Sequence, residues 1–166
     1  ARSARGPWLE SLRRAETAEG VSCDLLIDLQ GPELRVGALF APLTLREGDA
    51  VMGVLPLDTA ADVLIISRSG MSVRFHADGV PAQGRAAGGV KGMTLEPGDA
   101  LLWCGQPQAA DQVFLMTERG FAKRVLYMDF EPQARGGKGL RAIAFQKNGA
   151  TGTYLVDARL VMMPYD

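Results

Sequence analysis

The stretch DVLIISRSGMSVRF (62–75) decides the fold, because it returns further along the chain as QVFLMTERGFAKRV (112–125). The aligned pairs, at a constant shift of 50 residues, are Val63 with Val113, Gly70 with Gly120 and Arg74 with Arg124. Each stretch consists of two short apolar runs joined by turn residues, which is the pattern of a β-hairpin. A repeat of this length indicates an array of small, similar sheets.

The repeat extends to both sides of the hairpins. EGDAVMGV (47–54) aligns with PGDALLWC (97–104), and QGRAAGG (83–89) aligns with QARGGKG (133–139). A Pro-Gly-Asp turn separates two further apolar runs in the middle unit, so each unit contains about four strands. Four-stranded units of this size predict propeller-type blades, in which each blade buries its faces against its neighbours.

We expect one all-β domain of about three blades that either closes into a ring or stays open as an arc. The unit at 21–62 is short, because 18 residues separate its hairpin turn from its acidic turn residue, against 29 in the middle unit. It therefore lacks the Gly-rich segment. A short helix is expected over 7–20 from its proline start and terminal glycine. The parts are an N-terminal extension or blade remnant at 1–20, a degenerate blade at 21–62, a blade at 63–112, and a blade plus terminal strand at 113–166.

Composition limits the class of protein. The 166 residues are 47% hydrophobic and 22% charged, which suits a folded domain with a core. No apolar run is long enough to span a membrane and the N-terminus is charged, so we expect a cytoplasmic protein without membrane contact. Cys23 and Cys104 lie far apart without CxxC spacing, which favours reduced strand positions over a disulfide or a zinc site. The start at Ala1 suggests a piece of a longer protein.

The heptad QARGGKG (133–139) combines backbone freedom with positive charge. Three glycines let the backbone approach a ligand closely, and Arg135 and Lys138 suit a phosphate group. The same heptad also suits a solvated loop that only links two blades. The residue chemistry leaves both interpretations open.

The heptad resembles the Gly-rich basic box of the C-terminal domain of the DNA gyrase A subunit, with Ala134 where a basic residue usually stands. The longer stretch FLMTERGFAKRVLYMDFEPQARGGKGLRAI (114–143) is similar to the blade pattern of that family, and LIISRSGMSVRFHADGVPAQGRAAGGVKGM (64–93) is a second copy. The resemblance is strong over 63–147 and weaker over 21–62. It implies a β-pinwheel, a propeller variant with strand exchange between blades, around whose rim duplex DNA bends.

The resemblance implies a duplex-DNA binding domain of a type IIA topoisomerase A subunit, with no catalytic residue, metal or cofactor of its own. Its partners would be duplex DNA, the ATPase subunit, and the remaining domains of the parent chain. An incomplete propeller leaves strand edges exposed, so we expect either further sequence of the parent chain or self-association. Contacts would be electrostatic, with little base readout. The predicted DNA-binding residues are Arg68, Arg74, Arg85, Lys91, Arg119, Lys123, Arg124, Gln133, Arg135, Gly136, Gly137, Lys138, Gly139 and Arg141.

Some features depart from a strong DNA wrapper. The formal net charge is −1, whereas DNA-wrapping domains are usually basic. The first copy of the box has Ala86, Ala87 and Gly88 in place of Gly-Gly-Lys. These departures favour topoisomerase IV, whose boxes are eroded, or a divergent gyrase. The alternative function is a β-propeller protein–protein interaction module whose basic loops are incidental.

Other motifs do not indicate catalysis. Lys138 is followed by glycine and not by Ser or Thr, so the heptad is not a nucleotide-binding P-loop. His76 has no second ligand at metal spacing, and we expect it to be solvated or hydrogen-bonded. Tyr127 and Trp103 are expected to pack within the blades. No cluster of acids, metal ligands or activated nucleophiles supports a propeller-class enzyme.

Overall fold

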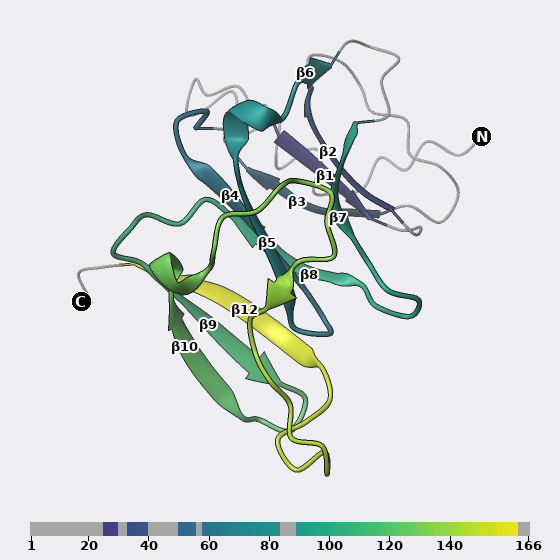
Figure 1. The fold of residues 1–166 in the computed structure, drawn as a ribbon, viewed down its shortest axis with the longest axis vertical. Coiled ribbons are helices and arrows are strands. Elements are labelled where there is room, and N and C mark those ends of the chain that lie inside the picture. The colour runs from purple at the N-terminus through teal and green to yellow at the C-terminus, as the bar shows by residue number, and fades with distance from the viewer. Residues whose placement is uncertain (1–24, 30–32, 40–49, 56–57, 84–88, 163–166) are drawn as a thin grey trace, which may run out of the picture.

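The structure is a computed structural model that describes residues 25–29, 33–39, 50–55, 58–83 and 89–162. The predicted helix at 7–20 and Cys23 lie outside these residues. The described chain consists of β-strands and two single-turn 3₁₀-helices (Figure 1). In chain order they are β1 (Leu25–Leu29), β2 (Glu33–Leu39), β3 (Ala50–Leu55), β4 (Asp62–Ser67), β5 (Met71–His76), η1 (Ala77–Gly79), β6 (Ala82–Gln83), β7 (Val90–Thr94), β8 (Leu101–Gly105), β9 (Gln112–Thr117), β10 (Ala122–Leu126), η2 (Tyr127–Asp129), β11 (Leu140–Arg141) and β12 (Leu155–Val161).

The strands form three sheets, one for each predicted blade. Sheet one contains β3, β1, β2, β6 and β7, sheet two contains β11, β5, β4 and β8, and sheet three contains β10, β9 and β12. Sheet two lies between the other two (Figure 1). The all-β, propeller-like class is therefore confirmed, although the sheets have five, four and three described strands instead of four each.

The unequal strand numbers follow from strand exchange. Each sheet is built on a hairpin and the last strand of the same repeat unit. Sheet one gains β6 and β7 from the next unit, and sheet two gains β11. Thus β7 of the middle unit pairs with β2, and β11 of the last unit pairs with β5. Among the described residues, no strand from a further unit pairs with the outer edge of β10. The exchange that the resemblance implies is present.

The core consists of two layers, one on each side of sheet two. Val63 and Ile65 of β4 point into the layer toward sheet one, while Leu64 and Ile66 point into the layer toward sheet three. All four side chains are fully buried. A strand that is covered on both faces does not alternate between apolar and polar residues. This explains why β4 contains a continuous apolar run. Each such side chain contributes about 1.5–3 kcal/mol by leaving water.

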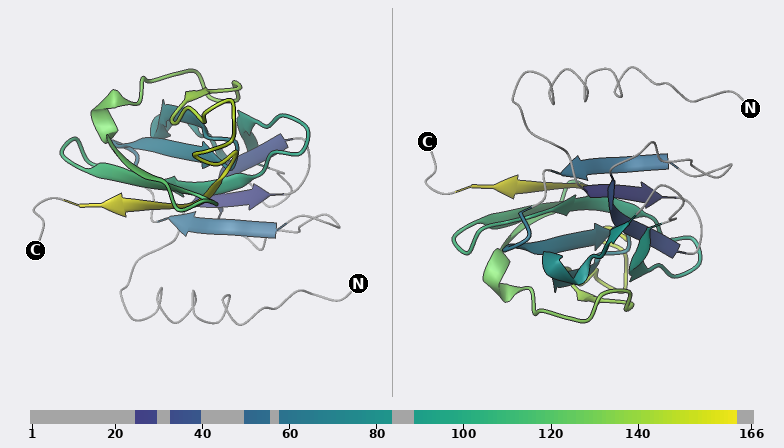
Figure 2. Two further views of the ribbon diagram at one scale, coloured as in Figure 1. Left: turned by 90° about the horizontal axis from the view of Figure 1, so that it is seen from below. Right: turned by 90° about the horizontal axis from the view of Figure 1, so that it is seen from above.

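The two faces of the array differ. Figure 2 shows β3 and β12 on one side of the molecule, and η1, η2 and the segment that follows η2 on the opposite side. The Gly-rich segment thus lies on the outer side, away from these inner strands. Within the described part of the chain, no helix is long and apolar enough to cross a membrane.

Candidate functional site

The Gly-rich segment 133–139 crosses from sheet three over the outer strands of the other two sheets. Its first residue donates a backbone hydrogen bond to β5, from Gln133 N to Arg74 O at 2.7 Å. Its centre pairs with β7, where Gly136 N donates to Gly92 O and Thr94 N donates to Gly137 O, both at 2.8 Å. The segment is therefore an ordered connection that fastens three sheets together.

Two glycines of this segment have backbone conformations that other residues avoid. Gly136 and Gly139 have φ angles of 85° and 84°. A Cβ atom at Gly139 would overlap the backbone carbonyl of Ser72 on β5. Glycine at 139 is thus required by the close approach of the segment to sheet two.

The polar side chains of the segment already have protein partners. Arg135 donates from Nη1 to Lys91 O at 2.6 Å and from Nε to Gly79 O at 3.3 Å. Lys138 forms an exposed ion pair with Glu96 at 2.6 Å, and this carboxylate raises the pKa of Lys138 above its usual value. These contacts within the protein compete with the phosphate binding that the sequence predicts for the heptad.

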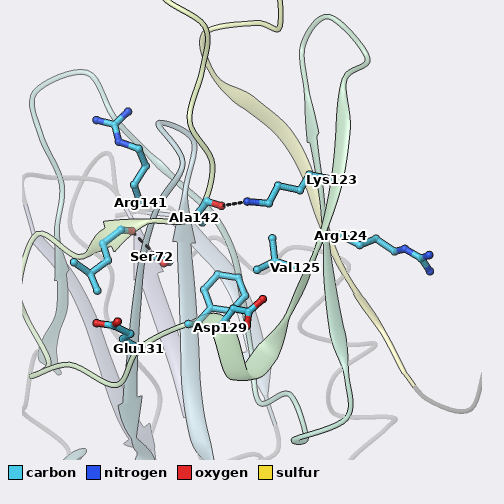
Figure 3. A pocket seen from close by; sticks show the side chains of 10 residues that line it. Ser72, Lys123, Arg124, Val125, Asp129, Glu131, Arg141 and Ala142 are labelled. Carbon is cyan, nitrogen blue, oxygen red and sulfur yellow. Dashed lines mark hydrogen bonds between the residues drawn. The ribbon is translucent and has the colours of Figure 1, made fainter.

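A notch of about 490 Å³ lies between sheets two and three, beside the end of the Gly-rich segment (Figure 3). Lys123 of β10 points toward Ala142 and donates to its carbonyl oxygen at 3.2 Å. Arg141 of β11 reaches outward from the opposite wall, and both cations lie toward one end of the notch, whereas Asp129 and Glu131 lie toward the other end. Cations from two neighbouring sheets and two carboxylates thus share one concave surface.

Arg124 also borders the notch but points the other way. Lys123 and Val125 face sheet two, while the side chain of Arg124 extends from the opposite face of β10 (Figure 3). Successive side chains of a strand alternate between its faces, so adjacent basic residues cannot both enter the notch. Arg124 is exposed on the outer face of sheet three.

Arg74 lies inside the molecule, although the repeat aligns it with Arg124. Its Nε donates to Asp62 Oδ2 at 2.7 Å, its Nη1 donates to Phe130 O at 2.9 Å, and its guanidinium lies 4.1 Å from the ring centroid of Tyr127. Only 11% of its side chain is exposed. Arg74 therefore does not present its charge at the surface as Arg124 does, because it joins sheet two to sheet three.

Asp62 is the acceptor at the centre of this internal cluster. Its Oδ2 accepts from Arg74 and from the hydroxyl of Tyr127, the latter at 2.9 Å. Burial acts to raise the pKa of Asp62, but the hydrogen bonds from Arg74 and Tyr127 outweigh it and hold the pKa below the usual 3.8. Burial, with the hydrogen bond to Asp62, raises the pKa of Tyr127 to about 12. Tyr127 is a packing residue, as predicted.

The remaining predicted residues lie apart from one another. Arg68 is exposed at the turn of the β4–β5 hairpin, 4.7 Å above the ring of Tyr154, and Arg119 is exposed at the turn of the β9–β10 hairpin. Lys91 is half-buried on β7. Arg85 lies outside the described residues. Of the predicted residues that the structure describes, those that line this notch are Lys123, Arg124 and Arg141.

Several sequence expectations about single residues are confirmed. His76 is exposed and pairs with Asp78 at 2.7 Å, which raises the pKa of the imidazole. Cys104 is a free thiol, and burial raises its pKa to about 12. Trp103 packs against the core layer between sheets two and three.

Comparison with known sequences matches residues 61–105 and 111–151 to the family described as DNA gyrase C-terminal domain, beta-propeller. The A subunit of DNA gyrase from Mycolicibacterium smegmatis is 35% identical over 127 residues, which cover 74% of this chain. The chain spans only 15% of the length of that relative. The matched residues include the internal cluster, the Gly-rich segment and the notch.

Comparison with solved structures supports the same architecture. The crystal structure of the C-terminal domain of DNA topoisomerase IV matches with a TM-score of 0.68 and 20% identity over 83% of this chain and 46% of that chain. The structure of a DNA gyrase A C-terminal domain matches with a TM-score of 0.66 and 20% identity, over 86% and 50%. At this identity the similarity concerns the fold.

Proposed function

The chain belongs to the family of DNA gyrase C-terminal domains, and we propose that it binds and bends duplex DNA as a non-catalytic domain of a type IIA topoisomerase. In this proposal it presents DNA to the catalytic core for strand passage. Its partners are DNA, the ATPase subunit, and the other domains of the gyrase or topoisomerase IV chain that carries it, and it works in the cytoplasm. Self-association through the edge of sheet three is a further part of the proposal.

The notch between sheets two and three is the observation that carries the proposal. Lys123 and Arg141 come from different sheets and lie toward the same end of this notch. A phosphate seated there would contact both blades at once, as a DNA path along the rim requires. Asp129 and Glu131 reduce the local positive charge, which fits moderate and non-specific affinity.

Exposed arginines extend this contact surface. The hairpin turns of sheets two and three carry Arg68 and Arg119, and Arg124 lies on the outer face of sheet three. We therefore assign the phosphate contacts to a group that we call the rim cations. They are Arg68, Arg119, Lys123, Arg124 and Arg141.

The test is duplex binding by a variant that lacks the two notch cations, Lys123→Ala/Arg141→Ala. Its dissociation constant for a 40-base-pair duplex should rise at least about tenfold at low salt, and the slope of log affinity against log salt should fall by about two. Lys147→Ala/Arg159→Ala removes the same charge from outside the notch and should change neither value. Equal behaviour of the two double variants would exclude the notch as a phosphate site.

A further inference from the structure

We propose that Arg135, the arginine of the Gly-rich segment, is a positioning residue that fixes the angle between the sheets and does not itself contact phosphate. This inference rests on the proposed function, because the angle matters through the path of the bound DNA. Its physical basis, a brace across the sheets, can be measured without DNA.

The guanidinium of Arg135 joins parts of the chain that belong to different sheets. Lys91, whose carbonyl oxygen accepts from Nη1 at 2.6 Å, lies on β7 in sheet one. Gly79, whose carbonyl oxygen accepts from Nε at 3.3 Å, ends η1 directly after β5 of sheet two. Arg135 itself comes from the unit that forms sheet three. The side chain therefore links sheet one to the end of sheet two, and it is carried by the connection that leads out of sheet three.

The backbone around Arg135 strengthens the bridge. Besides the two backbone hydrogen bonds between the segment and β7, the hydroxyl of Thr94 donates to Gly136 O at 2.7 Å. Gly136 lies against the Lys91 carbonyl, where a Cβ atom would come within 3.5 Å. This contact lets the segment follow β7 closely enough for the arginine to reach the carbonyl oxygen.

The same geometry argues against Arg135 as a phosphate contact. Its side chain is half-buried, and two of its donor groups bond to backbone carbonyl oxygens, so both hydrogen bonds would be lost if the guanidinium turned outward. Giving up two such hydrogen bonds is unfavourable. By contrast, Arg141, six residues along the chain, is exposed on the rim of the notch.

The experiment compares Arg135→Ala and Arg135→Lys with Arg141→Ala in three measurements. Hydrogen exchange of the Thr94 and Gly136 amides is followed without DNA, since both amides lie in the braced contact. The salt dependence of binding to a 40-base-pair duplex counts phosphate contacts. Energy transfer between dyes at the two duplex ends reports the bend of the bound DNA. Replacing a residue that only stabilises the fold would not alter this bend. Circular dichroism checks that each variant is folded.

For a brace, both Arg135 variants should exchange these amides about tenfold faster or more, and Arg141→Ala should not. The salt slope should stay at the wild-type value in the Arg135 variants while the DNA bend decreases, and it should fall by about one in Arg141→Ala. If Arg135→Ala does not fold, Arg135→Lys decides, because lysine keeps the charge but cannot make the forked contact.

Unchanged amide exchange together with a slope lowered by about one in Arg135→Ala would overturn the inference and make Arg135 a phosphate contact. Wild-type protein that binds no duplex would refute the proposed function. The exchange measurement would then still decide whether Arg135 braces the sheets.

Discussion

Replacing Asp62 with alanine should destabilise the fold by about 2–4 kcal/mol, because it removes the acceptor shared by two sheets. Asp62 Oδ2 accepts from Arg74 at 2.7 Å and from Tyr127 at 2.9 Å, and only 17% of its side chain is exposed. Hydrogen bonds to a charged group contribute about 1.5–3 kcal/mol each. Water entering the vacated site recovers part of this sum, and Arg74 keeps its bond to the Phe130 carbonyl.

The assay is thermal and urea unfolding at pH 7, followed by circular dichroism. For a domain of this size, a loss of about 2–4 kcal/mol corresponds to a fall in Tm of about 6–12 °C. The matched control is Asp157→Ala, which breaks the exposed pair with Arg159, whose side chain is 75% exposed. It should lower Tm by no more than about 2 °C. The reasoning is refuted if the two variants have the same Tm.

Three further predictions concern the same interfaces. The pKa of Asp62 is lowered in the folded state, so its contribution is complete above its usual 3.8 and is lost as the pH falls through the folded-state value. The stability difference between wild type and Asp62→Ala, measured by urea unfolding, should therefore shrink from about pH 5 downward, and a constant difference would contradict this. Tyr127→Phe should lower the unfolding free energy by about 1 kcal/mol, and urea unfolding equal to wild type would show that the hydroxyl contributes nothing. Gly139→Ala should lower Tm by more than Gly98→Ala, because both have positive φ but only Gly139 would also meet the Ser72 carbonyl; equal melting curves would disprove the close approach.

The sequence predicted the repeat architecture well. The hairpins at 62–75 and 112–125 appear as β4–β5 and β9–β10, and the turn glycines Gly70 and Gly120 both have positive φ. These features depend on local patterns of apolar and turn residues. The strand exchange came only from the family resemblance, because a strand as short as β11 carries no local signal of which hairpin it joins.

The candidate site was less predictable, because identical repeat positions have different surroundings. Arg74 and Arg124 align, but the acid that pairs with Arg74 is Asp62, and its equivalent in the next unit is Gln112. The sequence nevertheless contained a feature that distinguishes the two arginines. In the β4–β5 ladder Asp62 pairs with His76, so Asp62 and Arg74 lie on the same face of the hairpin. An acidic residue at position 62 therefore indicates that Arg74 forms an ion pair within the protein.

The Gly-rich segment 133–139 shows why a basic loop cannot be assigned as a ligand site from its sequence alone. Composition cannot distinguish an arginine that faces solvent from one that bonds to a carbonyl oxygen 44 residues earlier, as Arg135 does with Lys91. That difference depends on how the sheets are arranged. The positive φ of Gly139 and its approach to sheet two likewise become visible only in three dimensions.

The most direct test of the proposed function is the dissociation constant of the unmodified chain for a 40-base-pair duplex at 50 mM and 200 mM salt. If three rim cations contact phosphates, affinity should fall about 40-fold between these two conditions, and more if all five take part. Absence of binding at 50 mM salt, or an affinity that does not change with salt, would contradict electrostatic DNA binding by this domain.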